Sequence, residues 1–214
     1  MKRTLSLCLC SAALLGLASG AGARTVNDCH ISSGTLCVEA KLAGADLKKA
    51  NLARANLFAA DLAGANLSGA NLTEARLQDA NLQRAALTGA VLAGADLKRA
   101  ELMQADLEGA DLSNANLEDA QLRGAHLAGA TLTGASMRGA GLAQATLKGA
   151  DLQRANLTAA ELRGADLRDA DLRGTVLRDA NLQGADLTGA RTDSATDLRG
   201  ANFEGCTGCP AAKP

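Results

Sequence analysis

Leucine recurs at every fifth position over most of this 214-residue chain, and this period constrains the fold more than any other feature. From Ala40 to Gly189 the sequence divides into 30 consecutive pentapeptides without an insertion. Position one of the unit is alanine in 29 cases, with Thr175 as the exception, and position three is leucine in 29 cases, with Met137 as the exception. Position two is mostly Asp, Asn or another polar residue, and position five is glycine in 15 units.

A five-residue period excludes both a long helix and a uniform strand. Successive helical residues are about 100° apart, so leucines five residues apart would advance by about 140° and scatter over every face. A uniform strand would place alternate leucines on opposite faces, because the period is odd. The first three residues of each unit do alternate, which predicts a short β-step with positions one and three inward. Glycine at position five predicts a type II turn, so the chain must wind into stacked coils filled with leucine and alanine.

The A-(D/N)-L-x-x pattern resembles the pentapeptide-repeat family, and it covers 150 residues. The resemblance implies an all-β fold, a right-handed quadrilateral parallel β-helix (solenoid) with four pentapeptides per coil and about 7–8 coils. At about 4.8 Å between stacked strands, the rod is expected to be roughly 36 Å long. Residues 20 apart are then stacked neighbours. We expect Met137 and Thr175 to be tolerated core substitutes, and Phe203, at a leucine position, to plug the last coil.

The chain divides into a repeat region and two irregular ends. The phase of the repeat slips by one residue between Arg191 and Asp197, before the pattern returns. The ends of a solenoid need covering, because exposed strand edges invite pairing with other chains. The expected segments are a signal peptide at 1–23, an N-terminal cap at 24–39, the β-helix at 40–190, and imperfect repeats with a C-terminal cap and tail at 191–214.

The first residues have the features of a secretory signal. Lys2 and Arg3 precede an apolar run over residues 5–17, and a small-residue site ends at Ala23. This pattern predicts cleavage near Ala23-Arg24 and a periplasmic or secreted protein. The run is too short for a membrane span, so we expect no stable span. An alternative is a lipoprotein signal that uses Cys8 or Cys10.

Four cysteines remain after residue 23, and all lie in the two ends. Export favours disulfides, and bridged Cα atoms lie within about 7 Å. Because the rod implied by the resemblance holds its ends farther apart than this, we expect the pairs Cys29–Cys37 and Cys206–Cys209. The alternative for Cys206 and Cys209 is a redox or metal site. That alternative lacks both the βαβ context of a thioredoxin-like motif and a second pair of metal ligands.

The sequence contains no set of residues that predicts catalysis. The two histidines, His30 and His126, have no assignable Ser, Cys or acidic partner. The glycines are spread at corner spacing rather than gathered in a phosphate-binding loop. We therefore expect no enzyme activity, no cofactor and no metal. Without residues 1–23 the chain has 20 Lys+Arg against 23 Asp+Glu, a formal charge of −3, so it offers no basic patch for nucleic acid.

Two groups of charged residues stand out from the repeat. Four arginines occupy successive position-four corners, where we expect them to pair with nearby aspartates; they are Arg163, Arg168, Arg173 and Arg178, and the aspartates are Asp166, Asp169, Asp171 and Asp179. Acidic residues crowd a little over one coil, beside a weakly basic stretch with Arg123, Arg138 and Lys148. We interpret both groups as charged surface that faces solvent. The alternative is that they form a surface on which a partner docks. The acidic candidate surface is Asp96, Glu101, Asp106, Glu108, Asp111, Glu118 and Asp119.

The favoured function is a structural or protein-interaction scaffold in the cell envelope or outside the cell. Its protein partner is unknown, and the chain is expected to be a monomer or an end-to-end homodimer. The resemblance implies an alternative, because some members of the family mimic DNA and bind DNA gyrase. The signal peptide, the weak charge and the absence of a looped-out insertion all disfavour that alternative. Ice or crystal binding is also disfavoured, because the position-two column from Asn51 to Asp171 is mixed and charged.

Overall fold

The structure, a computed structural model, describes residues 24–209. The expected signal peptide lies outside the described residues. The described chain begins with a hairpin in which β1 (Arg24–Val26) pairs antiparallel with β2 (Cys29–Ile31). Both residues of the connecting turn, Asn27 and Asp28, have positive φ, as a type I′ hairpin turn requires. Within residues 24–209, no helix has the length and apolar character needed to cross a membrane.

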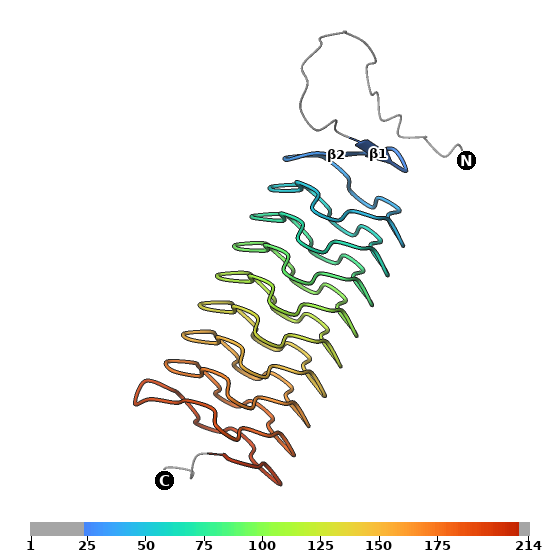
Figure 1. The fold of residues 1–214 in the computed structure, drawn as a ribbon. Coiled ribbons are helices and arrows are strands. Elements are labelled where there is room, and N and C mark those ends of the chain that lie inside the picture. Colours follow the sequence, from blue (N-terminus) through green and yellow to red (C-terminus); the bar gives the residue numbers. More distant parts are fainter. Residues whose placement is uncertain (1–23, 210–214) are drawn as a thin grey trace, which may run out of the picture.

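After the hairpin, the chain forms coils that stack in parallel, and Figure 1 shows them as a rod with β1 and β2 at one end. Position-two residues 20 apart form parallel β-bridges, beginning with Leu36 and Asn56. Three kinds of backbone hydrogen bond join neighbouring coils along the rod. One runs from the N–H of position five to the carbonyl of position four in the next coil, as from Gly94 to Ser113 at 2.9 Å. The Leu107 N–H donates to the His126 carbonyl at 2.7 Å, and the His126 N–H donates to the Ala105 carbonyl at 2.9 Å. Each coil therefore satisfies the backbone groups of the next coil.

Every pentapeptide ends in a tight corner. At a representative corner, the Ala95 N–H donates to the Leu92 carbonyl at 2.9 Å, and Gly94 has a φ of 65°. A positive φ at the third turn residue is the mark of the type II turn. All position-five residues from 44 to 189 have positive φ, including the 15 that are not glycine. Closing the coil therefore imposes this conformation even on Ala59 and Ala159, where it is sterically costly.

The interior is filled by the position-one and position-three side chains. The leucines from Leu42 to Leu187 are at most 1% exposed. Met137 lies fully buried at a leucine position, and Thr175 lies fully buried at an alanine position. The Thr175 hydroxyl Oγ1 donates to the Leu152 carbonyl at 2.7 Å. The hydroxyl that replaces an alanine methyl group at this position-one site therefore has a hydrogen-bond partner. This bond removes the cost of placing a polar atom among aliphatic side chains.

Coil-to-coil pairing extends beyond residues 40–190 at both ends, since the bridges run from Leu36 to Thr207. After Arg191 each bridge joins residues one position farther apart than before, beginning with Val176 and Asp197, which agrees with the phase slip in the sequence. Polar side chains adapt the insertion to the neighbouring coil. The Asp193 carboxylate accepts from the Gly174 N–H at 2.9 Å, and the Thr196 Oγ1 donates to the Leu172 carbonyl at 2.9 Å.

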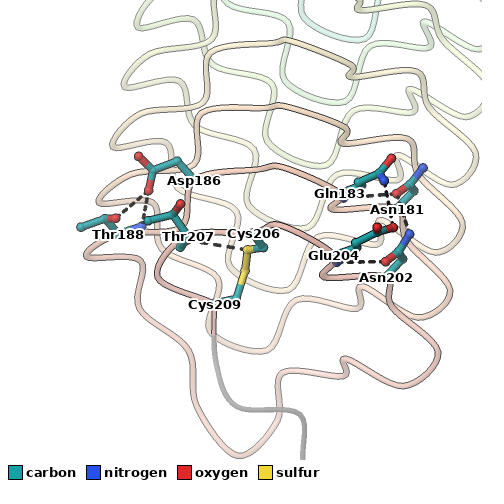
Figure 2. The surroundings of a disulfide bond; sticks show 9 residues. All are labelled: Asn181, Gln183, Asp186, Thr188, Asn202, Glu204, Cys206, Thr207 and Cys209. Atoms are coloured by element: carbon teal, nitrogen blue, oxygen red, sulfur yellow. Dashed lines mark hydrogen bonds between the residues drawn. A yellow bond between two sulfur atoms is a disulfide. The ribbon is translucent and has the colours of Figure 1, made fainter.

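The cysteines lie in the two ends of the rod. Cys29, on β2, lies beside Cys37, which fills a position-three site, with the Cα atoms 5.4 Å apart. Cys206 lies beside Cys209 in the last coil, with the Cα atoms 6.0 Å apart (Figure 2). Phe203 is half-buried and packs against the end of the core.

Candidate interaction surface

Outward side chains lie on four faces, because successive pentapeptides occupy successive sides of a coil. We call them faces A to D, and we give each corner the letter of the face that it follows. The position-two residues run from Asp46 to Thr207 on face A, from Asn51 to Arg191 on face B, from Leu36 to Asp197 on face C, and from Lys41 to Asn202 on face D. Residues five apart in the sequence thus lie on different faces, and residues 20 apart lie on one face.

Position-two side chains have two structural tasks, which explains the preference for Asp and Asn. Their side-chain oxygens accept from the N–H of position four, as Asp96 does from Lys98 at 3.2 Å. They also form ladders between coils. The Asn116 amide donates to Asp96 at 3.0 Å, and the Asn81 amide donates to Asp61 at 3.1 Å. Much of the acidity of the sequence therefore stabilises corners and coil stacking.

The acidic residues of the candidate surface are distributed over all four sides of the rod. Asp96, Glu101, Asp106 and Asp111 lie on faces C, D, A and B in turn, so they encircle the rod. The remaining three occupy two corners: Glu108 at corner A, and Glu118 with Asp119 at corner C. The expected acidic residues therefore form a band around the rod, because a spacing of five residues turns the chain to the next side of the coil, and docking of a partner on this band stays a prediction.

Several of these acids are already engaged within the protein. Glu118 accepts from the Lys98 ammonium at 3.0 Å and lies 3.9 Å from the Arg138 guanidinium. The hydrogen bond from Lys98 is the main reason that the pKa of Glu118 lies below its usual value. Asp106 accepts from the Thr88 hydroxyl at 2.8 Å. These contacts leave fewer carboxylates available to a partner.

The four corner arginines divide into three that form ion pairs and one that does not. Arg168 contacts Asp166 at 2.6 Å, as expected. Arg178 instead contacts Asp197, in the next coil, at 2.8 Å. Within residues 24–209, Arg163, Asp169 and Asp179 form no ion pair, so these expected pairs were wrong. The register shift after Arg191 brings Asp197 under Arg178, which sequence spacing alone did not indicate.

Asp171 is the one buried acid on the outer faces of the described chain, with 3% of its surface exposed. Arg173 contacts its carboxylate at 2.6 Å from the same unit, and Arg191 contacts it at 2.8 Å from the next coil. The hydrogen bonds from Arg173 are the main cause of a lowered pKa for Asp171, and the charge of Arg191 adds to them. This cluster ties the last regular coil to the coil that contains the insertion.

Replacing Asp171 by asparagine is expected to lower the free energy of unfolding by about 1–2 kcal/mol at pH 7, because two charge-assisted contacts are lost. The control is Asp151→Asn, one coil earlier on face B, where the carboxylate forms no ion pair within residues 24–209. Since the folded-state pKa of Asp171 is lowered, its contribution is present above the unfolded pKa of about 3.9 and is lost as pH falls through the folded pKa. Urea unfolding at pH 7 and pH 3 tests this, and an equal loss in both variants at pH 7 contradicts it.

A small apolar area near the N-terminal end was not expected from the sequence. Leu36 is 82% exposed at a position-two site, and Val38 and Phe58 lie one coil apart at corner C. Val38 and Phe58 are 20 residues apart, which is one coil. Once the coil length is known, this spacing could have identified the apolar area from the sequence. Nothing in the described residues covers Leu36.

The histidines lie apart from each other and from any described catalytic arrangement. His30 is exposed on β2, and His126 is exposed on face A beside Asp106. Among residues 24–209, no group of three or more His, Cys, Asp or Glu residues is arranged to hold a metal ion.

Comparison with protein families finds one match. A model of pentapeptide repeats matches residues 35–73, 80–119, 115–154 and 155–191. A search of curated protein sequences found no match. Among solved structures, the chain is similar to HetL, a pentapeptide repeat protein involved in heterocyst differentiation regulation from the cyanobacterium Nostoc sp. strain PCC 7120. The two are 41% identical over 81% of this chain and 74% of HetL, with a TM-score of 0.37.

Two further solved structures have related repeats. A pentapeptide repeat protein from the thylakoid lumen of Arabidopsis thaliana is 35% identical over 48% of this chain and 68% of its own, with a TM-score of 0.43. A trypsin-treated form of QnrB1, a plasmid-mediated fluoroquinolone resistance protein, is 22% identical over 67% of this chain and 82% of its own, with a TM-score of 0.52. The likeness to QnrB1 concerns the fold alone.

Proposed function

The chain belongs to the pentapeptide-repeat family, with its all-β right-handed β-helix, and from this membership we propose that it is an exported, non-enzymatic scaffold that binds a protein partner. One observation carries the proposal. Leucine, alanine, Met137 and Thr175 fill the interior between residues 42 and 187, so recognition has to use the outer faces and corners. Those outer positions carry regular ladders and turns on a rigid frame. A surface of this kind suits binding rather than catalysis.

The finer architecture that we propose is a four-sided rod of about 7–8 coils. The register of the bridges, which joins Lys41 to Asp61 and Asp61 to Asn81, supports four pentapeptides per coil. The hairpin of β1 and β2 is proposed as the N-terminal cap, and the region after Arg191 as the C-terminal cap. The rod is a monomer or an end-to-end homodimer, which light scattering coupled to gel filtration distinguishes.

Export and the two disulfides form one linked proposal. The Cα separations of 5.4 Å for Cys29–Cys37 and 6.0 Å for Cys206–Cys209 support bridging within each end. Such bridges persist in an oxidising compartment, which agrees with the signal-like residues 1–23. We place the mature protein in the periplasm or outside the cell.

The intact mass of the protein from separated cell fractions tests this proposal. The expected result is a periplasmic or secreted species that begins at Arg24 and is about 4 Da lighter than the reduced chain, because two disulfides remove four hydrogens. A species in the cytoplasm that retains residues 1–23 contradicts both export and disulfide formation.

Binding to DNA gyrase is the competing function, and the distribution of charge gives it no support. A DNA mimic needs a continuous acidic face, whereas the acids here encircle the rod and several are paired. We expect the purified protein to leave the rate of DNA supercoiling by gyrase unchanged. Inhibition or drug protection in a supercoiling assay would favour the DNA-mimic function instead.

A further inference from the structure

Corner D is the one corner without an acidic side chain over most of the rod. It contains positions four and five after each face D residue, from Ala43 to Gly184. Its charged residues over this range are Arg84, Arg123 and Arg163. The other three corners carry acids, which are Glu108 and Asp169 at corner A, Glu74 at corner B, and Glu39, Asp79, Glu118, Asp119 and Asp179 at corner C.

Two of these arginines lack the internal partner that similar arginines have. In each Asp-Leu-Arg triplet described here, the arginine Nε and Nη2 donate to both oxygens of the aspartate two residues earlier, at 2.6–2.9 Å. These pairs are Asp166–Arg168, Asp171–Arg173 and Asp197–Arg199. At the place of this aspartate, two residues earlier, Arg123 has the uncharged Gln121 and Arg163 has Glu161.

Glu161 does not take the place of the aspartate. Its carboxylate accepts from the Asn181 amide at 3.0 Å, in the ladder of face D. Within residues 24–209, Arg123 and Arg163 form no ion pair and no side-chain hydrogen bond, and both are exposed. Their guanidinium groups are therefore available to a ligand.

Both arginines line a surface hollow of about 600 Å³, which also includes Ala143 and Gln144 and extends past Arg163 to Gln183 in the next coil. Arg123, Ala143 and Arg163 occupy the same corner position in three successive coils. The two arginine backbones are thus about 9.6 Å apart, two coil spacings, with a small side chain between them. Two side chains of this length can close on one group that sits over Ala143.

We propose that this hollow binds an oxyanion group, a phosphate or a sulfate, between Arg123 and Arg163. Guanidinium groups bind such anions through paired, charge-assisted hydrogen bonds. A tetrahedral oxyanion presents oxygens to two arginines on opposite sides and to the Gln144 amide at the same time. A carboxylate can also bind two arginines, as Asp171 does with Arg173 and Arg191, so polyglutamate is included in the test as the competing ligand.

This proposal rests on the proposed function in one respect, which is that the protein recognises its ligands on the outer surface of the rod. Calorimetric titration of the purified protein at low ionic strength tests it, with inorganic phosphate and inorganic sulfate as free ions and heparin as a sulfated polymer. Arg123→Gln and Arg163→Gln are each expected to weaken binding at least about tenfold. The control is Arg154→Gln, which removes the same charge from an exposed corner B position outside the hollow. Glutamine already occupies equivalent corner positions at Gln104 and Gln144.

A second variant keeps all arginines and the net charge. Glu161→Asp recreates the Asp-Leu-Arg triplet and is expected to draw Arg163 into an internal pair, which weakens binding severalfold. Asp61 already occupies an equivalent face D position, so the backbone accepts an aspartate there. Circular dichroism checks that each variant remains folded.

Binding of the free ions places the site among small-anion sites, and binding of heparin alone assigns it to esterified oxyanions. The proposal is overturned if none of the three probes binds, if Arg154→Gln weakens binding as much as Arg163→Gln, or if polyglutamate binds as tightly as heparin. None of these outcomes bears on cell location, so failure here is distinguishable from failure of the export proposal.

Discussion

Replacing Leu107 by alanine is expected to lower the free energy of unfolding by about 2–5 kcal/mol. Leu107 is 0% exposed, in the middle of a column whose neighbours are Leu87 and Leu127. Its removal leaves a cavity that the neighbouring coils are poorly able to fill, because their backbones are held by hydrogen bonds on both sides of Leu107. Urea unfolding followed by circular dichroism measures the loss.

The matched control is the same substitution at Leu36, which is 82% exposed on face C. Leu36→Ala is expected to change stability by no more than about 0.5 kcal/mol, as is usual for surface sites. The comparison separates burial from residue type. Equal losses at Leu36 and Leu107 would show that the leucine column is not a packed core.

Replacing Gly94 by proline is expected to cost about 3 kcal/mol or more. Gly94 has a φ of 65°, whereas proline fixes φ near −65°. The substitution also removes the N–H that donates to the Ser113 carbonyl at 2.9 Å, one of the bonds that join two coils. Both effects act in the middle of the rod, so unfolding in urea is expected to begin at a lower concentration.

The adjacent substitution, Ala93→Pro, is expected to be nearly neutral, within about 1 kcal/mol. Ala93 is the second residue of the same type II turn, where proline is favoured. Its N–H has no acceptor among residues 24–209, because Val91 at position two has no side-chain oxygen. If both proline variants are equally destabilised, the corners do not have the turn type described here.

The sequence predicted the frame of this protein well, because the frame depends on a local pattern repeated many times. The family resemblance is confirmed by the match to pentapeptide repeats. The β-helix solenoid, the inward leucines and the turn at position-five glycines follow from a period that neither a helix nor a strand accommodates. The phase slip after Arg191 was also visible in the sequence and recurs as a shift in the register of the bridges.

The sequence was less informative about the surface, because proximity along the chain is a poor measure of proximity on a coil. The acids from Asp96 to Asp119 are close in sequence, yet they encircle the rod. Arg178 pairs with Asp197, and Arg191 pairs with Asp171, across coils. Arg123 and Arg163 are far apart in the sequence, yet they line one hollow.

What the sequence alone determined is therefore the coil and its filling. Alanine and leucine occupy fixed places in 29 of the 30 units each, and winding the chain into a coil brings both inside. The tertiary structure decided the conformation of the 15 corners without glycine, where closure of the coil imposes positive φ against local preference. It also decided which charges meet, because the stacking of one coil on the next sets the neighbours of each side chain. The physical reason is that burial follows from a local pattern, whereas an ion pair depends on the register of two coils.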